Sequence, residues 1–300
     1  MALSIWFQLG RIMMSGGAIK SFNVGIRRRW LGGLTHALSA AGGIWLITEI
    51  TTKVSDTAEH WIKDHGNYYS AFVLVVSAIW FLWHVYEVRS VAFNLPTTDT
   101  RIRIRYGNLF EQPTDWLIGV GEFFDSDVGH VVSQNSLHGK LINSTYGGDT
   151  ALFRALVDNA LTGIKGTRTQ RPIAPKTKYD IGTTVVLARS PHKVFLVAMS
   201  YTDPETSKAS SDVATLWNAL RGALTTVRNH GNGAPLSLPL IGNGQSSVNI
   251  APHHLLRLIV LALVDYGRRT GLPKEVSIIV PENCFEALDI REIRRDWRKR

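Results

Sequence analysis

The sequence predicts an α/β fold, a mixed sheet with helices on both faces, preceded by an N-terminal transmembrane helical hairpin. Two observations lead to this prediction. Residues 31–48 and 68–86 are apolar runs without a formal charge, and each is long enough, at about 18 residues or more, to span a bilayer. From residue 101 onwards, short apolar runs alternate with segments of helical periodicity, which is typical of α/β domains.

The charges beside the two apolar runs predict how the hairpin is oriented. Arginines cluster before the first run and after the second, whereas the loop between the runs balances lysines against acidic residues. By the positive-inside rule, both termini and the following domain lie in the cytoplasm, and residues 51–67 face outward. A cleaved signal peptide is not expected, because nothing resembles a cleavage site and a second run returns the chain. The alternative is a pair of helices buried in a soluble core.

Small residues recur at helical spacing in the first run, and such ridges let membrane helices pack closely. The sequence leaves open whether they pack against a second copy of the chain or against the second run of the same chain. One ridge comprises Thr35, Ser39 and Gly43, and the other comprises Gly33, Ala37 and Ala41. Near the cytoplasmic ends of the runs, His36 and His84 are expected to lie at the membrane boundary.

The chain divides into five predicted parts. They are an N-terminal segment (1–30), the hairpin (31–90), a linker (91–100), the α/β domain (101–293) and a basic tail (294–300). Residues 5–14 suit a short interfacial helix. The linker is predicted because its residues lose periodicity and include Pro96 with threonine and aspartate.

Within the α/β domain, periodicity predicts the elements. Residues 101–106 (RIRIRY) alternate strictly, so the arginines face solvent and Ile102, Ile104 and Tyr106 face the core. Strands are predicted at 115–121, 183–188, 193–200, 234–241 and 275–281. Helices are predicted near 129–142, 149–161, 211–230 and 252–269, with a proline- and lysine-rich excursion at 166–180.

The composition and motifs of the chain limit which partners and which kinds of site it can have. The net charge of +9 favours anionic partners such as nucleotides, nucleic acid or acidic lipid. Cys284 is the only cysteine, which excludes a disulfide framework and a cysteine-based zinc site. The chain contains no Walker A, GxGxxG, HExxH or GxSxG motif. Adjacent His253 and His254 cannot both face one ligand, so no metal site is predicted.

Two loops are candidates for a binding site. Ligands of α/β sheets bind beyond the carboxyl ends of the strands, and the loops at 119–128 and 241–249 both follow predicted strands. In the second loop, glycines let backbone amides approach an anion at the start of the next helix. The first loop contains Glu122, Asp125 and Asp127, which are either acid–base groups or an ordinary solvated cluster.

Three stretches resemble a known family. RIRIRYGNLFEQPTDWLIGVGEFFD (101–125), SQNSLHG (133–139) and SLPLIGNGQSSVN (237–249) are similar to the macro domain. More narrowly, they resemble the divergent macro domain of type II Thoeris antiphage effectors, ThsA-like proteins in which it follows a two-span membrane segment. The resemblance covers roughly residues 101–293 and implies a macro-domain-like mixed sheet that binds ADP-ribose and its derivatives.

The resemblance also implies ligand-binding residues, with two departures from ordinary macro domains. The Gly-Asp pair whose carboxylate meets adenine is replaced by Gly107-Asn108, and the asparagine-rich turn of the hydrolases is replaced by residues 121–124. These departures favour a ligand-binding sensor over an enzyme that removes ADP-ribose, so no catalytic residue is expected. The implied ligand-binding residues are Asn108, Gly121, Glu122, Phe123, Phe124, Asp125, Ser136, His138, Gly242, Asn243, Gly244 and Gln245.

By this resemblance, the expected function is that of an antiphage effector that is not an enzyme and needs no cofactor or metal. A partner TIR-domain enzyme makes an ADP-ribose-derived signal from NAD, in this type a histidine–ADP-ribose conjugate, which the macro domain binds. Binding is expected to assemble homo-oligomers that damage the lipid of the bacterial inner membrane, causing abortive infection, and no nucleic-acid partner is implied. The alternatives are a membrane-anchored ADP-ribosyl hydrolase, with Glu122 or Asp125 orienting water, and an ADP-ribose-binding regulatory subunit whose hairpin is a tether.

Overall fold

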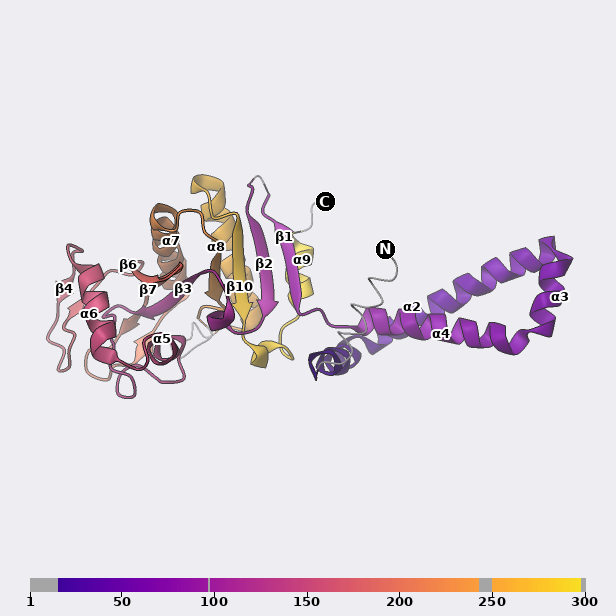
Figure 1. Ribbon diagram of the computed structural model, residues 1–300, viewed down its shortest axis with the longest axis horizontal. Helices are drawn as coiled ribbons and strands as arrows, with labels where there is room; N and C mark the ends of the chain where they lie inside the picture. The colour runs from indigo at the N-terminus through magenta and orange to yellow at the C-terminus, as the bar shows by residue number, and fades with distance from the viewer. Residues whose placement is uncertain (1–15, 97, 243–249, 298–300) are drawn as a thin grey trace. The chain divides into compact units, whose positions relative to one another are not determined.

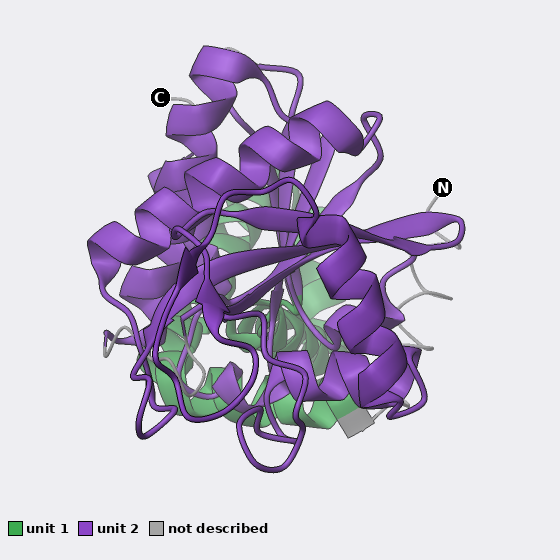
Figure 2. Cartoon of the chain, turned by 90° about the vertical axis from the view of Figure 1, so that its left-hand side faces the viewer, with its two compact units in different colours: residues 1–89 green, residues 90–300 purple. Residues whose placement is uncertain are grey.

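The computed structural model describes residues 16–96, 98–242 and 250–297. The chain forms two compact units, Met1–Arg89 and Ser90–Arg300, which Figure 2 shows in different colours. Among the described residues, the first unit contains only helices and the second contains the sheet (Figure 1).

The first unit is a helical hairpin. Its helices are α2 (Gly16–Val54), α3 (Asp56–Asp64) and α4 (Gly66–Val85). Both α2 and α4 are long and apolar enough to cross a membrane, as their sequences predict. Many of their large apolar side chains are exposed, for example Trp45, Leu74 and Trp83 by 64%, 70% and 74%. Only 6% of the apolar window of each helix is buried, so the two helices do not form a buried core in this structure.

The hairpin differs from the prediction at its ends. Helix α2 begins well before residue 31 and is interrupted at Arg29, whose φ of −135° and ψ of 17° are not helical. The loop between the two apolar runs contains α3, which Ser55 caps by accepting a hydrogen bond from the Ala58 amide. The interfacial helix predicted at residues 5–14 lies outside the described residues.

The two small-residue ridges of α2 have different surroundings. Gly33 packs against α4, where a β-carbon would lie 2.7 Å from Val85 Cγ1. At Gly43, by contrast, a β-carbon would meet nothing within 4 Å. The ridge of Gly33 therefore closes the hairpin, and the ridge of Gly43 lies open on the surface of the unit. At the base of the hairpin, the rings of His36 and His84 lie with centroids 4.0 Å apart.

The second unit is built on a mixed sheet. Its strand order is β1-β2-β10-β9-β3-β7-β6, with β8 paired to β7. Strands β2, β10, β9, β3 and β7 run parallel, and the edge strands β1 and β6 are antiparallel to their neighbours. The strands are β1 (Ser90–Asn94), β2 (Arg101–Tyr106), β3 (Asp115–Gly121), β6 (Thr184–Arg189), β7 (His192–Thr202), β8 (Ala209–Ser210), β9 (Leu236–Pro239) and β10 (Glu275–Val280), and β4 (Thr167–Arg168) with β5 (Thr177–Lys178) forms a separate hairpin.

Helices cover both faces of the sheet, as predicted (Figure 1). On one face, Leu141 of α5 and Phe153 of α6 share a core cluster with Ile118 of β3. Leu117 points to the opposite face, because successive strand residues alternate, and α7 and α8 cover that face (Figure 1). The helices are α5 (Leu137–Thr145), α6 (Thr150–Leu161), α7 (Val213–His230), α8 (Pro252–Thr270) and α9 (Ile290–Asp296), with short 3₁₀ turns at Leu109–Glu111 and Glu282–Cys284.

Four predicted segments need correction. Residues 91–94 of the predicted linker form β1 together with Ser90, and Pro96 lies in the turn that leads back to β2. The helix predicted near 129–142 begins only at Leu137, because Ser136 caps it by accepting a hydrogen bond from the Gly139 amide. The excursion at 166–180 contains the β4–β5 hairpin. The predicted basic tail overlaps the end of α9.

Candidate functional site

A cleft runs along the edge of the sheet where the parallel strands end. Residues at the end of each of these strands, or up to three residues beyond it, line the cleft: Asn108 after β2, Pro281 after β10, Gly242 after β9, Gly121 on β3 and Thr202 on β7. The cleft volume is about 810 Å³, which lies in the range of small-molecule sites. The expected shared rim of the loops after β3 and β9 is therefore present among the described residues.

One end of the cleft is apolar. Leu109, Leu240, Ile241 and Pro281 line it, beside the neighbouring strands β2, β10 and β9. The polar residues Glu111, Glu282 and Asn283, which follow β2 and β10, also line the cleft. Asn108 lies at this end, but its amide is engaged within the chain: Oδ1 accepts a hydrogen bond from the Phe110 amide at 3.1 Å, and Nδ2 donates to Glu111 Oε1 at 3.2 Å. Apolar side chains of this kind suit contact with a purine base.

The other end of the cleft is polar. The hydroxyl-bearing residues Ser200, Thr202 and Ser207 line it together with Asp125, beside strands β3 and β7. A surface rich in hydroxyl groups and a carboxylate suits a ligand that presents several hydroxyl groups of its own, such as a sugar.

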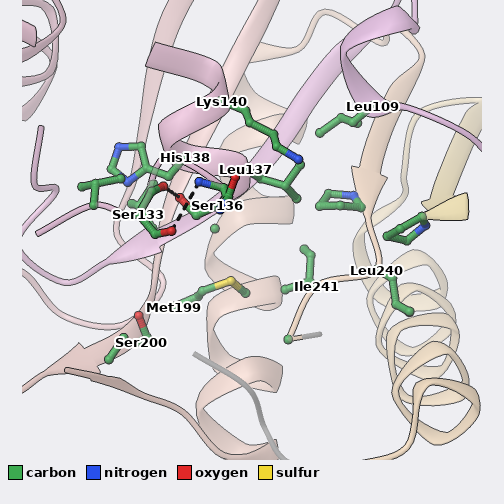
Figure 3. A pocket seen from close by; sticks show the side chains of 18 of the residues that line it. Leu109, Ser133, Ser136, Leu137, His138, Lys140, Met199, Ser200, Leu240 and Ile241 are labelled. Carbon is green, nitrogen blue, oxygen red and sulfur yellow. Dashed lines mark hydrogen bonds between the residues drawn. The ribbon is translucent and has the colours of Figure 1, made fainter. Parts of the chain in front are cut away.

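Helix α5 begins at the wall of the cleft. Ser136 Oγ donates to the Ser133 carbonyl at 2.6 Å and accepts from the Gly139 amide at 3.0 Å. A β-carbon at Gly139 would lie 2.3 Å from the Ser133 carbonyl oxygen, so only glycine lets the first turn pack this closely. Lys140 lines the cleft one turn further on. The helix N-terminus and this lysine together favour an anionic group here. Figure 3 shows these side chains on one wall, with Met199, Ser200, Leu240 and Ile241 on the others.

Some of the predicted ligand-binding residues lie at the cleft and others do not. Glu122, Phe123 and Phe124 do not line it, because their side chains are buried in the fold. Asn243, Gly244 and Gln245 lie outside the described residues. The predicted residues that line the cleft are Asn108, Gly121, Asp125, Ser136, His138 and Gly242, and their contact with a ligand stays a prediction.

His138 is a buried, uncharged member of the cleft wall. Its ring lies 5.6 Å from the Phe153 ring, centroid to centroid. Burial lowers the pKa of His138 to about 4, so the imidazole is neutral at pH 7. Its Nε2 atom is buried and has no hydrogen-bond partner among the described residues.

The two carboxylates that would orient water in the hydrolase alternative are both engaged. Glu122 Oε1 accepts a hydrogen bond from the Thr202 amide at 3.1 Å. Asp125 accepts two from the guanidinium of Arg171, at 2.6 Å to Oδ1 and 3.2 Å to Oδ2. Burial raises the pKa of Asp125 from its ordinary value, and the contact with Arg171 opposes this rise.

In the part of the chain that the structure describes, no three His, Cys, Asp or Glu side chains gather in a way that could hold a metal ion. The rings of His253 and His254 lie 3.9 Å apart at the start of α8. Neither histidine lines the cleft.

Several residues of the cleft were not predicted from the sequence. Ser200 and Thr202 on β7, and Pro281 after β10, follow from the strand-end rule once the strand order is known. Arg171, which does not line the cleft but contacts Asp125, has no such signal, because it is 46 residues away from Asp125 in the sequence and belongs to the excursion.

Comparisons with known proteins agree with this architecture. Among solved structures, the chain is similar to a mutant of the Oceanobacillus iheyensis macrodomain with ADPR, with a TM-score of 0.50 and 13% identity over 70% of this chain and 100% of that chain. It is also similar to the same macrodomain with ADP, with a TM-score of 0.47 and 12% identity over 69% of this chain and 95% of that chain. No curated protein matches the chain.

The sequence family adds a narrower assignment than the fold does. The family described as Thoeris protein ThsA, Macro domain, matches residues 102–281. This range is more than half of the 300 residues and contains all five parallel strands except the first residue of β2. It confirms the resemblance found in the sequence, and the chain therefore belongs to the ThsA macro domain family of Thoeris proteins.

Proposed function

We propose that this chain is a ligand-gated membrane effector of antiphage defence. Its macro domain binds an ADP-ribose-derived nucleotide, with histidine–ADP-ribose as the candidate signal, made by a partner TIR-domain enzyme. Binding assembles copies of the chain, and the assembled hairpins disrupt the bacterial inner membrane and cause abortive infection. The macro domain and both termini face the cytoplasm.

The layout of the cleft is the observation that carries the binding proposal. The cleft combines an apolar end, the start of α5 and a hydroxyl-rich end, which suit a base, a diphosphate and a sugar respectively. The macrodomain solved with ADPR has the same fold. An ADP-ribose derivative has these three parts, and the volume of about 810 Å³ is sufficient for it.

The effector proposal rests on the hairpin. Helices α2 and α4 expose apolar side chains along their length, which a bilayer would cover. The ridge of Gly43 is open and offers a surface for a second copy. A shift from a mostly resting to a mostly assembled population needs about 5 kcal/mol of difference in ligand affinity between the two states.

We propose that the protein does not hydrolyse ADP-ribosyl bonds. A general base must reach the water that it activates. The carboxylates of Glu122 and Asp125 instead hold the Thr202 amide and the Arg171 guanidinium. The assay is release of ADP-ribose from an ADP-ribosylated protein by the full-length chain, and sustained turnover would favour the hydrolase alternative.

The experiment that tests the binding proposal is calorimetric titration of the full-length chain in detergent micelles with ADP-ribose, histidine–ADP-ribose and NAD. We expect the conjugate to bind most tightly and to increase the particle mass measured by light scattering. Binding of none of these nucleotides would refute the proposal.

A further inference from the structure

We propose that Arg171, which does not itself line the cleft, is the positioning residue that shapes the polar end of the cleft and so determines recognition of the ligand beyond its diphosphate. This inference rests on the proposed nucleotide binding. It assigns a role to the excursion at 166–180, which otherwise has no connection with the site.

Arg171 is completely buried, with an exposed fraction of 0%. Its Nη1 donates to Asp125 Oδ1 at 2.6 Å and to the Pro175 carbonyl at 3.3 Å. Its Nη2 donates to Asp125 Oδ2 at 3.2 Å and to Ser207 Oγ at 3.3 Å. The guanidinium carbon lies 4.3 Å from the centroid of the Phe123 ring.

These contacts join three segments that are distant in the sequence. Asp125 belongs to the loop after β3, Pro175 to the excursion, and Ser207 to the turn between β7 and β8. Asp125 and Ser207 both line the cleft. The Arg171 side chain, which lies behind the polar end of the cleft, therefore sets the position of this end.

The backbone on both sides of this contact is in an unfavourable conformation. Phe124, next to Asp125, has φ of +51°, and Ser207 has φ of +57°. Residues other than glycine rarely adopt such angles, and they persist where surrounding contacts hold them. Arg171 supplies such contacts to both segments.

Lysine cannot replace arginine in this role. The planar guanidinium reaches both oxygens of one carboxylate and still donates to two other groups, whereas an ammonium is a point charge. Arg171→Lys keeps the positive charge beside Asp125 but loses the simultaneous contacts to Pro175 and Ser207. The matched control is Arg168→Lys, the same change at an exposed residue of β4 in the same excursion.

The test compares two nucleotides on the full-length chain in detergent micelles. ADP occupies the apolar end and the start of α5, and ADP-ribose adds a sugar that reaches the polar end. For Arg171→Lys we expect the Kd for ADP-ribose to rise by about tenfold or more, with the Kd for ADP changing by less than about twofold. Arg168→Lys should bind both nucleotides as the wild-type chain does.

The readout separates positioning from folding. Intact ADP binding shows that the rest of the cleft is folded, and an equal loss for ADP and ADP-ribose would overturn the inference. Unchanged ADP-ribose binding by Arg171→Lys would also overturn it. If this variant does not fold, Ser207→Ala replaces it, because it removes one contact and leaves the ion pair; the same selective loss is expected, and its absence contradicts the inference. A wild-type chain that binds neither nucleotide would refute the proposed function instead.

Discussion

Replacing Asp125 with asparagine tests whether its carboxylate stabilises the fold, as expected for a structural group and not for a catalytic one. Asp125 is 5% exposed and Arg171 0% exposed, and their two contacts are 2.6 Å and 3.2 Å long. The Asp125→Asn substitution would leave the positive charge of Arg171 buried without its counter-ion. Removing one partner of a buried pair typically costs about 3–5 kcal/mol. In a domain of this size, that corresponds to a fall in melting temperature of roughly 10 °C.

The assay is thermal unfolding of the full-length chain in detergent, followed by tryptophan fluorescence. The matched control replaces both partners, Asp125→Asn with Arg171→Met, and should recover much of the lost stability because no unpaired charge is then buried. Asp125→Asn with wild-type melting would refute the reasoning. Arg171→Met alone tests the predicted direction in which the stability deficit changes with pH. Without Arg171 the pKa of Asp125 rises further above its ordinary value, so the deficit of this variant should shrink as the pH falls and the carboxyl group is protonated.

Three further predictions follow from the cleft and the hairpin. Gly242 has φ of +90° and lines the cleft, so Gly242→Val should weaken ADP-ribose binding by about a hundredfold in calorimetry; wild-type affinity would place the phosphates elsewhere. The pKa of His138 is lowered from 6.5 to about 4, so between these values the unfolded chain binds a proton that the folded chain does not. Wild-type stability should then fall by about 3 kcal/mol more than that of His138→Gln as the pH drops from 7 to 4, and parallel denaturation curves would contradict this. Ser39→Leu with Gly43→Leu should preserve the hairpin but prevent ligand-induced assembly in light scattering, whereas Gly33→Leu should disrupt packing of α2 on α4; assembly by the double variant would exclude the open ridge as the interface.

Much of the second unit was predictable because its elements carry local signals. The strict alternation at 101–106 identified β2, and its Ile102, Ile104 and Tyr106 are buried as predicted. The rule that ligands bind beyond strand ends identified the loops after β3 and β9. These signals depend only on neighbouring residues, so they can be read from the sequence without knowledge of the tertiary structure.

The errors have equally specific causes. Pro96 and the polar residues near it mark a turn, but a turn within a β-hairpin and a linker between domains have the same composition. Helical periodicity before residue 137 did not become helix, because Ser136 offers a cap and Gly129 has φ of +104°. The burial of Glu122, Phe123 and Phe124, and the contact of Arg171 with Asp125, depend on pairings between distant segments that no local pattern encodes.

Dye release from liposomes tests the central claim most directly. The full-length chain is reconstituted in vesicles of bacterial lipid that contain a self-quenched dye, and histidine–ADP-ribose is added on the side of the macro domain. The account predicts no release without nucleotide, rapid release with it, and no release from Gly242→Val under the same conditions. Release that is independent of the nucleotide, or tight binding without release, would contradict a ligand-gated membrane effector.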